Sequence, residues 1–292
     1  MEQLEGRTAV VTGAASGMGR AFARRFAKAG MNVVLSDVEE PVLDEAVTEV
    51  AAIAADRNAE AIGVITDVAD ERAVAELADR SIEHFGTVNV VCNNAGVAGT
   101  GLVDGPGSIS TKDWKWVLDV NLWGVIHGHQ AFLPHLLDHG DGHIVNTASM
   151  AGHFPGHSAY TASKWAVVGI TEGLFTQLKT IGSTVGVSCL CPGWVNTNIA
   201  ESARNRPEWA APDALAEPSP QVEARFAMIR DQLASGRSPD EVADLVHDAV
   251  IDDSFWIFTD LSMVANLRPR FDAVLANRNP DWTRGFLGDD DE

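Results

Sequence analysis

The stretch Thr8-Ala9-Val10-Val11-Thr12-Gly13-Ala14-Ala15-Ser16-Gly17-Met18-Gly19 runs from a short apolar segment into a cluster of glycines. Residues 8–11 are apolar and partly β-branched, and apolar side chains recur at helical spacing after Gly17. The pattern therefore predicts a strand, a turn and a helix. Glycine permits positive φ and lets a ligand approach the backbone closely. A helix N-terminus offers unpaired N–H groups and a positive dipole end to a pyrophosphate. We therefore predict a phosphate-binding turn formed by Gly13, Ser16, Gly17, Met18 and Gly19.

Asp37 ends the next apolar run, 18 residues after Gly19. A carboxylate at this place can accept hydrogen bonds from the adenosine ribose hydroxyls. An aspartate that caps a helix or faces solvent is the alternative. The same carboxylate would repel the 2′-phosphate of NADP, and its neighbours Val38 and Ser16 carry no charge to attract that group. The sequence therefore predicts NAD as the cofactor and makes NADP the less favoured one.

Beyond this unit, apolar runs and amphipathic stretches keep alternating along the chain. Strands are predicted over residues 8–11, 32–36, 61–66, 89–92, 144–147, 185–190 and 255–259, and helices over 17–29, 41–55, 71–85, 113–139 and 158–181. The strand runs are continuously apolar, which is typical of strands covered on both faces. We predict an α/β fold, a single-domain Rossmann-type doubly wound parallel sheet of about seven strands with helices on both faces. Pro134 is expected to kink or break the helix over 113–139.

The regular alternation stops between residues 198 and 239, a stretch that is rich in proline and also holds Trp209, Phe226 and Met228. A long apolar insertion after a core strand is typical of a functional lid. We therefore divide the single domain 1–292 into a dinucleotide-binding and catalytic core (7–197), a substrate lid (198–239) and a C-terminal part (240–292). The last part is expected to add a helix, a strand, one more helix near residues 270–276 and an acidic, solvated tail.

Composition excludes several classes of function. The formal net charge is −20, and the pI near 4.7 disfavours nucleic acid and anionic membranes as partners. The first residues lack the basic and apolar regions of a signal peptide, and no apolar run is long enough to span a bilayer. Cys189 and Cys191 are expected to be buried thiols. His135 and His139 lack a third ligand of fitting spacing, so no metal site is predicted. We expect a cytoplasmic protein.

The only tyrosine of the chain, Tyr160, lies four residues before Lys164 near the start of a predicted helix. Residues at i and i+4 share a helix face, and a nearby ammonium lowers the phenol pKa from its ordinary value of about 10. Such a pair suits general acid/base chemistry between an alcohol and a ketone, although a plain surface pair has the same spacing. Asn121, Ser149 and the segments 93–96 and 192–197 also follow strands or lie on the helices beside them, where ligands of open α/β sheets bind.

Together these motifs resemble the short-chain dehydrogenase/reductase family over about residues 7 to 197. They are Thr12-Gly-x-x-x-Gly-x-Gly19, Asn93-Asn94-Ala95-Gly96, Tyr160-x-x-x-Lys164 and Pro192-Gly193. The resemblance implies that Tyr160 donates and accepts the proton and that Lys164 binds the nicotinamide ribose and lowers the tyrosine pKa. It further implies that Ser149 hydrogen-bonds the reacting oxygen and that Asn121 holds a water linked to Lys164.

The resemblance also assigns cofactor contacts: Asp67 and Val68 beside the adenine, Asn94, Ala95 and Gly96 on the adenosine side, Pro192 and Gly193 in the turn after the sixth strand, and Val195 and Thr197 near the nicotinamide amide and pyrophosphate. It implies a homodimer or homotetramer formed through the helices over 113–139 and 158–181. The spacing from Ser149 to Tyr160 is slightly shorter than is common in the family, so a tight loop with Pro155 and Gly156 at its tip is expected.

The expected function is hydride transfer between NAD(H) and an alcohol or carbonyl carbon. The small-molecule substrate is expected to be an apolar secondary alcohol or ketone, in a pocket lined by His153, Phe154, His157 and Trp194. Two alternatives remain open. One is an NADP-dependent carbonyl reductase. The other, from a different class, is a catalytically silent scaffold or sensor that binds the cofactor, although such a protein would not need Asn121, Ser149, Tyr160 and Lys164 together.

Substituting Asp37→Ala should relax cofactor choice, because the carboxylate is predicted both to bind the ribose and to repel a 2′-phosphate. Titrating the protein with NADH and with NADPH while following tryptophan fluorescence measures the two affinities. An NADH preference equal to that of the unsubstituted protein would exclude Asp37 as the residue that discriminates NADH from NADPH.

Overall fold

The computed structural model describes residues 3–99, 109–211 and 220–279. Within them, parallel strands form one sheet in the order β3-β2-β1-β4-β5-β6-β7. The strands are β1 (Thr8–Thr12), β2 (Asn32–Asp37), β3 (Ala61–Ile65), β4 (Val90–Asn93), β5 (His143–Thr147), β6 (Gly186–Cys191) and β7 (Trp256–Phe258). The predicted seven-stranded, doubly wound parallel sheet is thereby confirmed. The connections leave β1 and β4 in opposite directions, which creates the crevice where ligands of such sheets bind.

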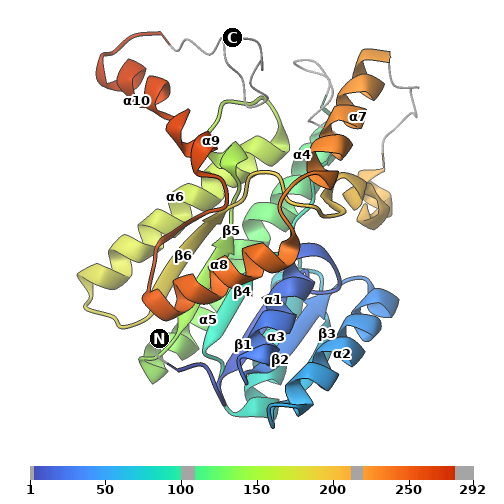
Figure 1. Cartoon of the computed structure of the whole chain (residues 1–292), viewed down its shortest axis with the longest axis vertical. Coiled ribbons are helices and arrows are strands. Elements are labelled where there is room, and N and C mark those ends of the chain that lie inside the picture. The colour runs from blue at the N-terminus through green and yellow to red at the C-terminus, as the bar shows by residue number, and fades with distance from the viewer. Residues whose placement is uncertain (1–2, 100–108, 212–219, 280–292) are drawn as a thin grey trace.

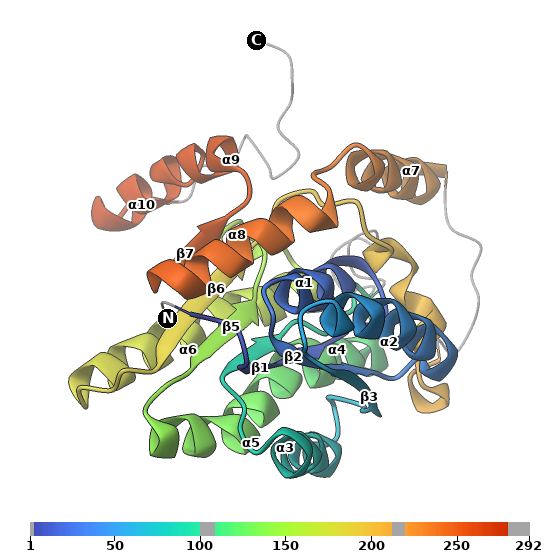
Figure 2. The ribbon, with the colours of Figure 1, turned by 60° about the horizontal axis from the view of Figure 1, so that its bottom comes forward.

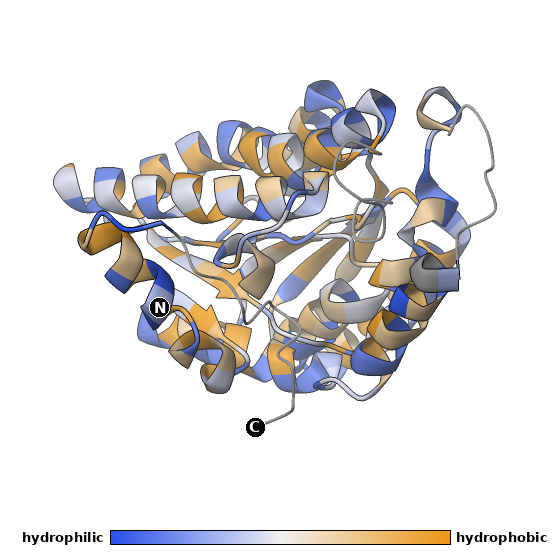
Figure 3. Cartoon of the chain, turned by 90° about the horizontal axis from the view of Figure 1, so that it is seen from above, coloured by the Kyte–Doolittle hydropathy of each residue, from blue (hydrophilic) through white to orange (hydrophobic). Residues whose placement is uncertain are grey.

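Helices cover both faces of the sheet (Figures 1 and 2). One face carries α1 (Gly17–Lys28), α2 (Glu40–Ala55) and α8 (Pro239–Asp252), and the other carries α3 (Glu71–Phe85), α5 (Gly124–His139) and α6 (Ala159–Thr180). Viewed from above, the apolar strands lie between the two helical layers (Figure 3). Successive strand residues point to opposite faces, so Ala9 and Val11 belong to one buried cluster and Val10 to the other.

The long helix predicted over residues 113–139 is interrupted, but not at Pro134. It consists of α4 (Thr111–Leu118), a π-helical turn (Asp119–Trp123) and α5. Pro134 lies inside α5 without ending it. Because Pro134 and Gln130 are both exposed, water can reach the carbonyl that the missing N–H leaves without a partner. The expectation of a break at Pro134 is therefore wrong, and the irregularity lies at Asn121 instead.

The segment after the core strands contains two 3₁₀ turns (Ile199–Asn205 and Glu208–Ala210) and α7 (Pro220–Ala234), and the chain then continues through α8 and β7 to α9 (Leu261–Ala265) and α10 (Arg268–Leu275). In Figure 1, α7 and α9–α10 lie outside the two layers of core helices. The predicted acidic tail lies outside the described residues. No helix of the described parts combines the length and apolar character needed to cross a bilayer.

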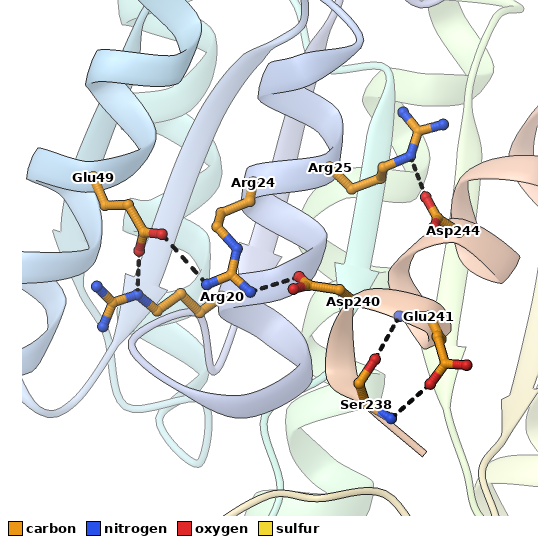
Figure 4. A network of polar contacts seen from close by, with 8 residues as sticks. All are labelled: Arg20, Arg24, Arg25, Glu49, Ser238, Asp240, Glu241 and Asp244. Carbon is orange, nitrogen blue, oxygen red and sulfur yellow. Dashed lines mark hydrogen bonds and ion pairs between the residues drawn. The ribbon is translucent and has the colours of Figure 1, made fainter.

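Ion pairs fix α8, the helix that follows the lid, against α1, the helix that follows the phosphate turn (Figure 4). Arg24 Nη2 lies 2.6 Å from Asp240 Oδ1, and Arg25 Nε lies 2.7 Å from Asp244 Oδ1. A capping box closes the first turn of α8. Exposed pairs of this kind stabilise a fold by less than about 1 kcal/mol each. These pairs therefore contribute mainly to the position of α8, which lies along α1 over the apolar cluster that both helices share.

The histidines considered as metal ligands make a structural contact. His135 Nε2 accepts a hydrogen bond from the N–H of Val88 (3.1 Å), and its ring meets that of His139 with centroids 4.7 Å apart. In the described ranges, no group of three or more His, Cys, Asp or Glu side chains could hold a metal ion. Cys189 and Cys191 are buried free thiols on the same side of β6, with their Sγ atoms 3.7 Å apart, as the sequence predicted.

His143, the first residue of β5, should make the stability of the fold depend on pH. Its ring is buried and lies 2.7 Å from Ser188 Oγ, and burial lowers its pKa to about 4. In the unfolded chain His143 takes up a proton near pH 6.5. In the folded chain it does so only near pH 4. The stabilising contribution is therefore complete above pH 6.5 and is lost as the pH falls toward 4. The loss should reach about 3 kcal/mol.

Urea unfolding at a series of pH values, compared with His143→Gln, measures this contribution. The unsubstituted protein should lose more free energy of unfolding between pH 6.5 and 4 than the variant does. The matched control is His84→Gln, which removes an exposed imidazole and should leave the pH dependence nearly unchanged. Parallel curves for the unsubstituted protein and His143→Gln would contradict the assignment.

Candidate active site

A cavity of about 1140 Å³ opens at the carboxyl ends of the strands. Its wall includes the turn after β1, the ends of β2 and β4, the start of α6 and residues of the lid, so it lies at the crevice between β1 and β4. The volume exceeds the roughly 300–1,000 Å³ of ordinary ligand pockets. The cavity is therefore large enough for a dinucleotide together with a small molecule.

The glycines of the phosphate turn are required by geometry. Gly13 and Gly17 have φ values of +66° and +54°, a region that favours glycine. A Cβ on Gly13 would lie 2.8 Å from Cα of Ala95, and one on Gly17 would lie 3.3 Å from Cγ2 of Thr197. A Cβ on Gly19 would overlap the carbonyl oxygen of Gly13. The turn at the start of α1 thus has no side chain at Gly13, Gly17 and Gly19, and the residues present fit the pyrophosphate of a dinucleotide.

A hydrogen-bond network joins the ends of β1, β4 and β5 beneath this turn. Thr12 Oγ1 accepts the N–H groups of Asn94 (2.9 Å) and Ala95 (3.1 Å), and Asn94 Nδ2 donates to the Thr12 carbonyl (2.9 Å). Thr147 Oγ1 donates to Asn94 Oδ1 (3.3 Å). Asn94 therefore holds three neighbouring strands in register at the edge that forms the site. The sequence pointed to Asn94, but it did not identify Thr12 or Thr147 as its partners.

Asp37 both holds the turn and lines the cavity. Its Oδ2 accepts the N–H of Ala15 (3.0 Å), and its Oδ1 accepts those of Val38 (2.7 Å) and Glu39 (3.2 Å). These bonds hold the turn before α2 but do not cap that helix, because its N-cap residue is Glu39 and no side chain caps it. The carboxylate also belongs to the cavity wall, where a ribose hydroxyl could donate to its remaining lone pairs.

Most of the other predicted cofactor contacts lie on the same wall. They are Ser16, Met18, Asp67, Val68, Ala95, Gly96, Pro192, Gly193, Val195 and Thr197. Asp67 Oδ1 accepts the N–H of Ala69 (2.9 Å), and the Val68 carbonyl meets His127 Nδ1 (2.9 Å). The first contact holds the loop after β3 in shape, and the second fixes it against α5. Gly19 is not part of the wall, because it serves the packing beneath the turn.

Ser149, Tyr160 and Lys164, which are predicted to take part in the reaction, all line the cavity. Ser149 follows β5 and caps a short 3₁₀ turn (Met150–Gly152), where its Oγ accepts the N–H of Ala151 (3.1 Å). Tyr160 lies in the first turn of α6 and shares a hydrogen bond with Ser149. Lys164 lies one turn later. Its Nζ lies 5.7 Å from the Tyr160 ring centroid and donates a hydrogen bond to the Thr147 carbonyl (2.9 Å). The structure thus brings Ser149, Tyr160 and Lys164 to one wall.

The charges in this group differ from the sequence-based expectation. Burial raises the pKa of Tyr160, and the hydrogen bond with Ser149 only partly opposes that rise. Burial also lowers the pKa of Lys164 to about 8. The expectation that Lys164 lowers the Tyr160 pKa is not met, because the ammonium is itself desolvated and donates to the Thr147 carbonyl rather than to the phenol. The desolvation of the Tyr160 phenol therefore has a larger effect on its pKa than the nearby Lys164 charge.

Asn121 lies behind the wall, fully buried in the π-helical turn. Its Oδ1 accepts the N–H of Val97 (2.8 Å), and its Nδ2 donates to the Val97 carbonyl (2.9 Å) and to Ser163 Oγ (3.1 Å). Ser163 Oγ in turn donates to the Tyr160 carbonyl (2.7 Å). Asn121 therefore positions both the segment after β4 and the turn that carries Tyr160.

The loop between Ser149 and Tyr160 is compact, as expected. Trp165 Nε1 donates to the Phe154 carbonyl (2.9 Å), and Pro155 and Gly156 are exposed at its tip. Three of the four predicted substrate residues line the cavity: Phe154, His157 and Trp194.

His153 does not line the cavity, so its assignment to the substrate pocket is corrected. Its Nε2 lies 3.4 Å from Cys191 Sγ, and its ring packs against Trp256 and Phe258 of β7. The short 3₁₀ turn before His153 sends its side chain toward the sheet edge, while Phe154 turns back to the cavity.

The segment that the sequence predicts to be a lid, residues 198–239, leaves and rejoins the core at one place. There Val195 and Arg237 form a parallel bridge, and the Arg237 N–H donates to the Trp194 carbonyl (3.0 Å). The described lid residues that reach the cavity are largely apolar and include Trp209, Phe226, Ile229 and Leu233. One residue of this segment, Ala210, belongs to the apolar cluster against which Tyr160 packs.

Two ion pairs that sequence reasoning missed hold the lid. Arg206 Nη2 lies 2.5 Å from Asp113 Oδ1, both side chains are nearly buried, and the guanidinium stacks 4.2 Å from the centroid of the Trp116 ring. Arg204 forms a two-point pair with Glu39 across 165 residues of sequence. No spacing rule connects such distant partners, so the sequence offered no signal for either pair.

With this geometry established, comparison with known proteins is informative. The short chain dehydrogenase family model matches residues 7–208. The 1-deoxy-11-beta-hydroxypentalenate dehydrogenase of Streptomyces avermitilis is 37% identical over 289 residues, covering 96% of this chain and 95% of that protein. A short-chain dehydrogenase/reductase from Burkholderia phymatum, solved in complex with NAD, is 40% identical with a TM-score of 0.89, and the match covers 96% of this chain and 98% of that one.

A metagenomic short-chain oxidoreductase solved in complex with NADP is 27% identical, with a TM-score of 0.65 and coverage of 88% of this chain and 96% of that one. The family match and the full-length relative together settle the class. This chain belongs to the short-chain dehydrogenase/reductase family, whose members are oxidoreductases that use nicotinamide cofactors.

Substituting Arg206→Met should destabilise the protein, because it leaves the buried Asp113 carboxylate without its guanidinium. Removing one partner of a buried pair costs about 3–5 kcal/mol, which urea unfolding measures. Arg268→Met is the matched control: it breaks an exposed pair with Asp272 and should cost less than about 1 kcal/mol. Adding Asp113→Asn to Arg206→Met should recover part of the loss. Equal effects of Arg206→Met and Arg268→Met would contradict the role given to the buried pair.

Proposed function

We propose that this protein transfers a hydride between NAD(H) and the alcohol or carbonyl carbon of a small apolar substrate, with Tyr160 as the general acid/base. The observation that carries the proposal is the shared cavity: Ser149, Tyr160 and Lys164 line the same space as the phosphate turn. A cofactor seated on the turn at one end and a substrate beside Tyr160 at the other would therefore meet inside one enclosure.

Gly13, Gly17 and the N-terminus of α1 would hold the pyrophosphate, and Asp37 would accept hydrogen bonds from the adenosine ribose. Bound nicotinamide supplies the carbon that accepts or donates the hydride. The Asp37 carboxylate disfavours a 2′-phosphate. The similarity to the NAD complex from Burkholderia phymatum also supports NAD over NADP.

Ser149 would bind the reacting oxygen of the substrate, and Tyr160 would transfer its proton. Ser149 Oγ would donate a hydrogen bond to that oxygen. During oxidation, Tyr160 Oη would take the hydroxyl proton of the alcohol, and during reduction it would return the proton to the carbonyl oxygen. With a pKa near 8, Lys164 is charged at neutral pH. Its ammonium donates to the Thr147 carbonyl, and we assign it the binding of the nicotinamide ribose.

The substrate is proposed to be an apolar secondary alcohol or ketone of the lipid, terpenoid or steroid kind. Trp209, Phe226, Ile229 and Leu233 of the lid and Phe154 of the core form an apolar wall. The relative from Streptomyces avermitilis is named for the dehydrogenation of a hydroxylated pentalenate, which is consistent with this class.

We further propose a cytoplasmic homodimer or homotetramer, with α4, α5 and α6 at the subunit contact. Trp123, beside α5, and Ile181, at the end of α6, are 48% and 67% exposed. Large apolar side chains left this open often mark contacts between subunits.

Substituting Tyr160→Phe should abolish most of the catalysis and leave cofactor binding intact, because only the hydroxyl that carries the proton is lost. We expect kcat for oxidation of a secondary-alcohol panel to fall by about 10²–10⁴-fold, with the NADH affinity from fluorescence titration changed less than about twofold. Thr176→Val removes a hydroxyl from the exposed part of the same helix and serves as the control. Unchanged kcat in Tyr160→Phe would overturn the proposed chemistry.

A further inference from the structure

The pair between Glu39 and Arg204 lies on the cavity wall, next to Asp37. Arg204 Nη2 lies 2.7 Å from Glu39 Oε1 and Arg204 Nε lies 3.1 Å from Glu39 Oε2, while Asn205 Nδ2 donates to the same Oε1 at 2.7 Å. The Glu39 N–H donates to Asp37 Oδ1. Glu39, Arg204 and Asn205 all line the cavity, together with Asp37.

The donors around the Glu39 carboxylate form a set that would also suit a phosphate. A guanidinium that offers two parallel N–H groups binds carboxylate and phosphate in the same geometry, and the Asn205 amide adds a third donor. Glu39 occupies these donors, and Arg204 lowers the pKa of the Glu39 carboxyl, so Glu39 is ionised at neutral pH. The nearby Asp37 carboxylate then leaves this end of the cavity with a net negative charge.

We propose that Glu39 determines cofactor specificity by holding Arg204 and Asn205, the donors that would otherwise receive the 2′-phosphate of NADP. The inference rests on the proposed placement of the adenosine ribose at Asp37. It assigns the discrimination to two residues, Asp37 through repulsion and Glu39 through occupation of the donors.

Arg204 would stay at this place without Glu39, because the lid backbone also holds it. Its Nη1 donates to the carbonyls of Glu201 (3.0 Å) and Asn198 (3.4 Å). Removing the Glu39 charge therefore leaves the guanidinium beside the ribose site and free to pair with a new anion. Arg204 is 39% exposed at its side chain, so the entering phosphate would meet it without displacing packed residues.

The test is a titration of Glu39→Gln with NADH and with NADPH, followed by tryptophan fluorescence. NADPH should bind about two- to fivefold more tightly than to the unsubstituted protein, the range expected for a partly exposed ion pair. NADH affinity should be nearly unchanged. Asp37 keeps its charge, so the preference is expected to weaken rather than to invert.

Two further variants separate the specific role of Arg204 from a general effect of charge. Glu40→Gln removes the same charge from the next, exposed residue, and the structure shows no contact between Glu40 and Arg204; it should leave NADPH affinity unchanged. The double variant Glu39→Gln with Arg204→Gln should lose the gain in NADPH affinity. A gain that persists in the double variant, or an equal gain in Glu40→Gln, would overturn the inference.

The outcomes also distinguish this inference from the proposed function. If the unsubstituted protein binds NADPH as tightly as NADH, the proposed preference for NAD fails. If it prefers NADH and Glu39→Gln keeps the full preference, only the role of Glu39 fails.

Discussion

The hydrogen bonds between Thr12, Asn94 and Thr147 join the ends of β1, β4 and β5, and both halves of the site depend on them. The phosphate turn begins at Gly13, directly after Thr12, while the Thr147 carbonyl accepts a hydrogen bond from the Lys164 ammonium. A doubly wound sheet leaves an open crevice at this edge, where strand ends would otherwise expose polar groups. Asn94 satisfies those groups across three strands and thereby keeps the phosphate turn at a set place relative to the reacting side chains.

The cavity above this network has two chemically different ends, and the lid is attached at both. At the adenosine end, Asp37 and Glu39 supply negative charge, and Glu39 holds the lid through Arg204. Toward α4, the buried contact of Arg206 with Asp113 anchors the lid by a charge pair that cannot be solvated. The remaining lid side chains on the cavity wall are mostly apolar. One continuous segment of chain thus forms part of both the proposed cofactor site and the proposed substrate site.

Much of the fold was predictable because strands buried on both faces and glycine turns leave local signals. The turn at Gly13 to Gly19 and the pair Tyr160 and Lys164 follow from spacing alone. Features that depend on long-range contacts were not predictable. The helix irregularity lies at Asn121 rather than Pro134, because Asn121 bonds to a distant backbone segment. The site of His153 and the partners of Arg204 and Arg206 likewise depend on packing across the sheet. The direction of the Tyr160 pKa depends on burial, which spacing does not report.

We propose that one cavity holds both the cofactor and the phenol that transfers the proton. Because Tyr160 is the only tyrosine, its ionisation can be followed by near-ultraviolet absorbance, with Tyr160→Phe as the blank. We expect the pKa of Tyr160 to lie above the ordinary value of about 10 in the free protein, because burial raises it. Saturating NAD⁺ should lower this pKa, because the positive charge of a nicotinamide ring in the same cavity would favour the phenolate. An ordinary pKa that NAD⁺ leaves unchanged, at concentrations where fluorescence shows binding, would contradict the claim.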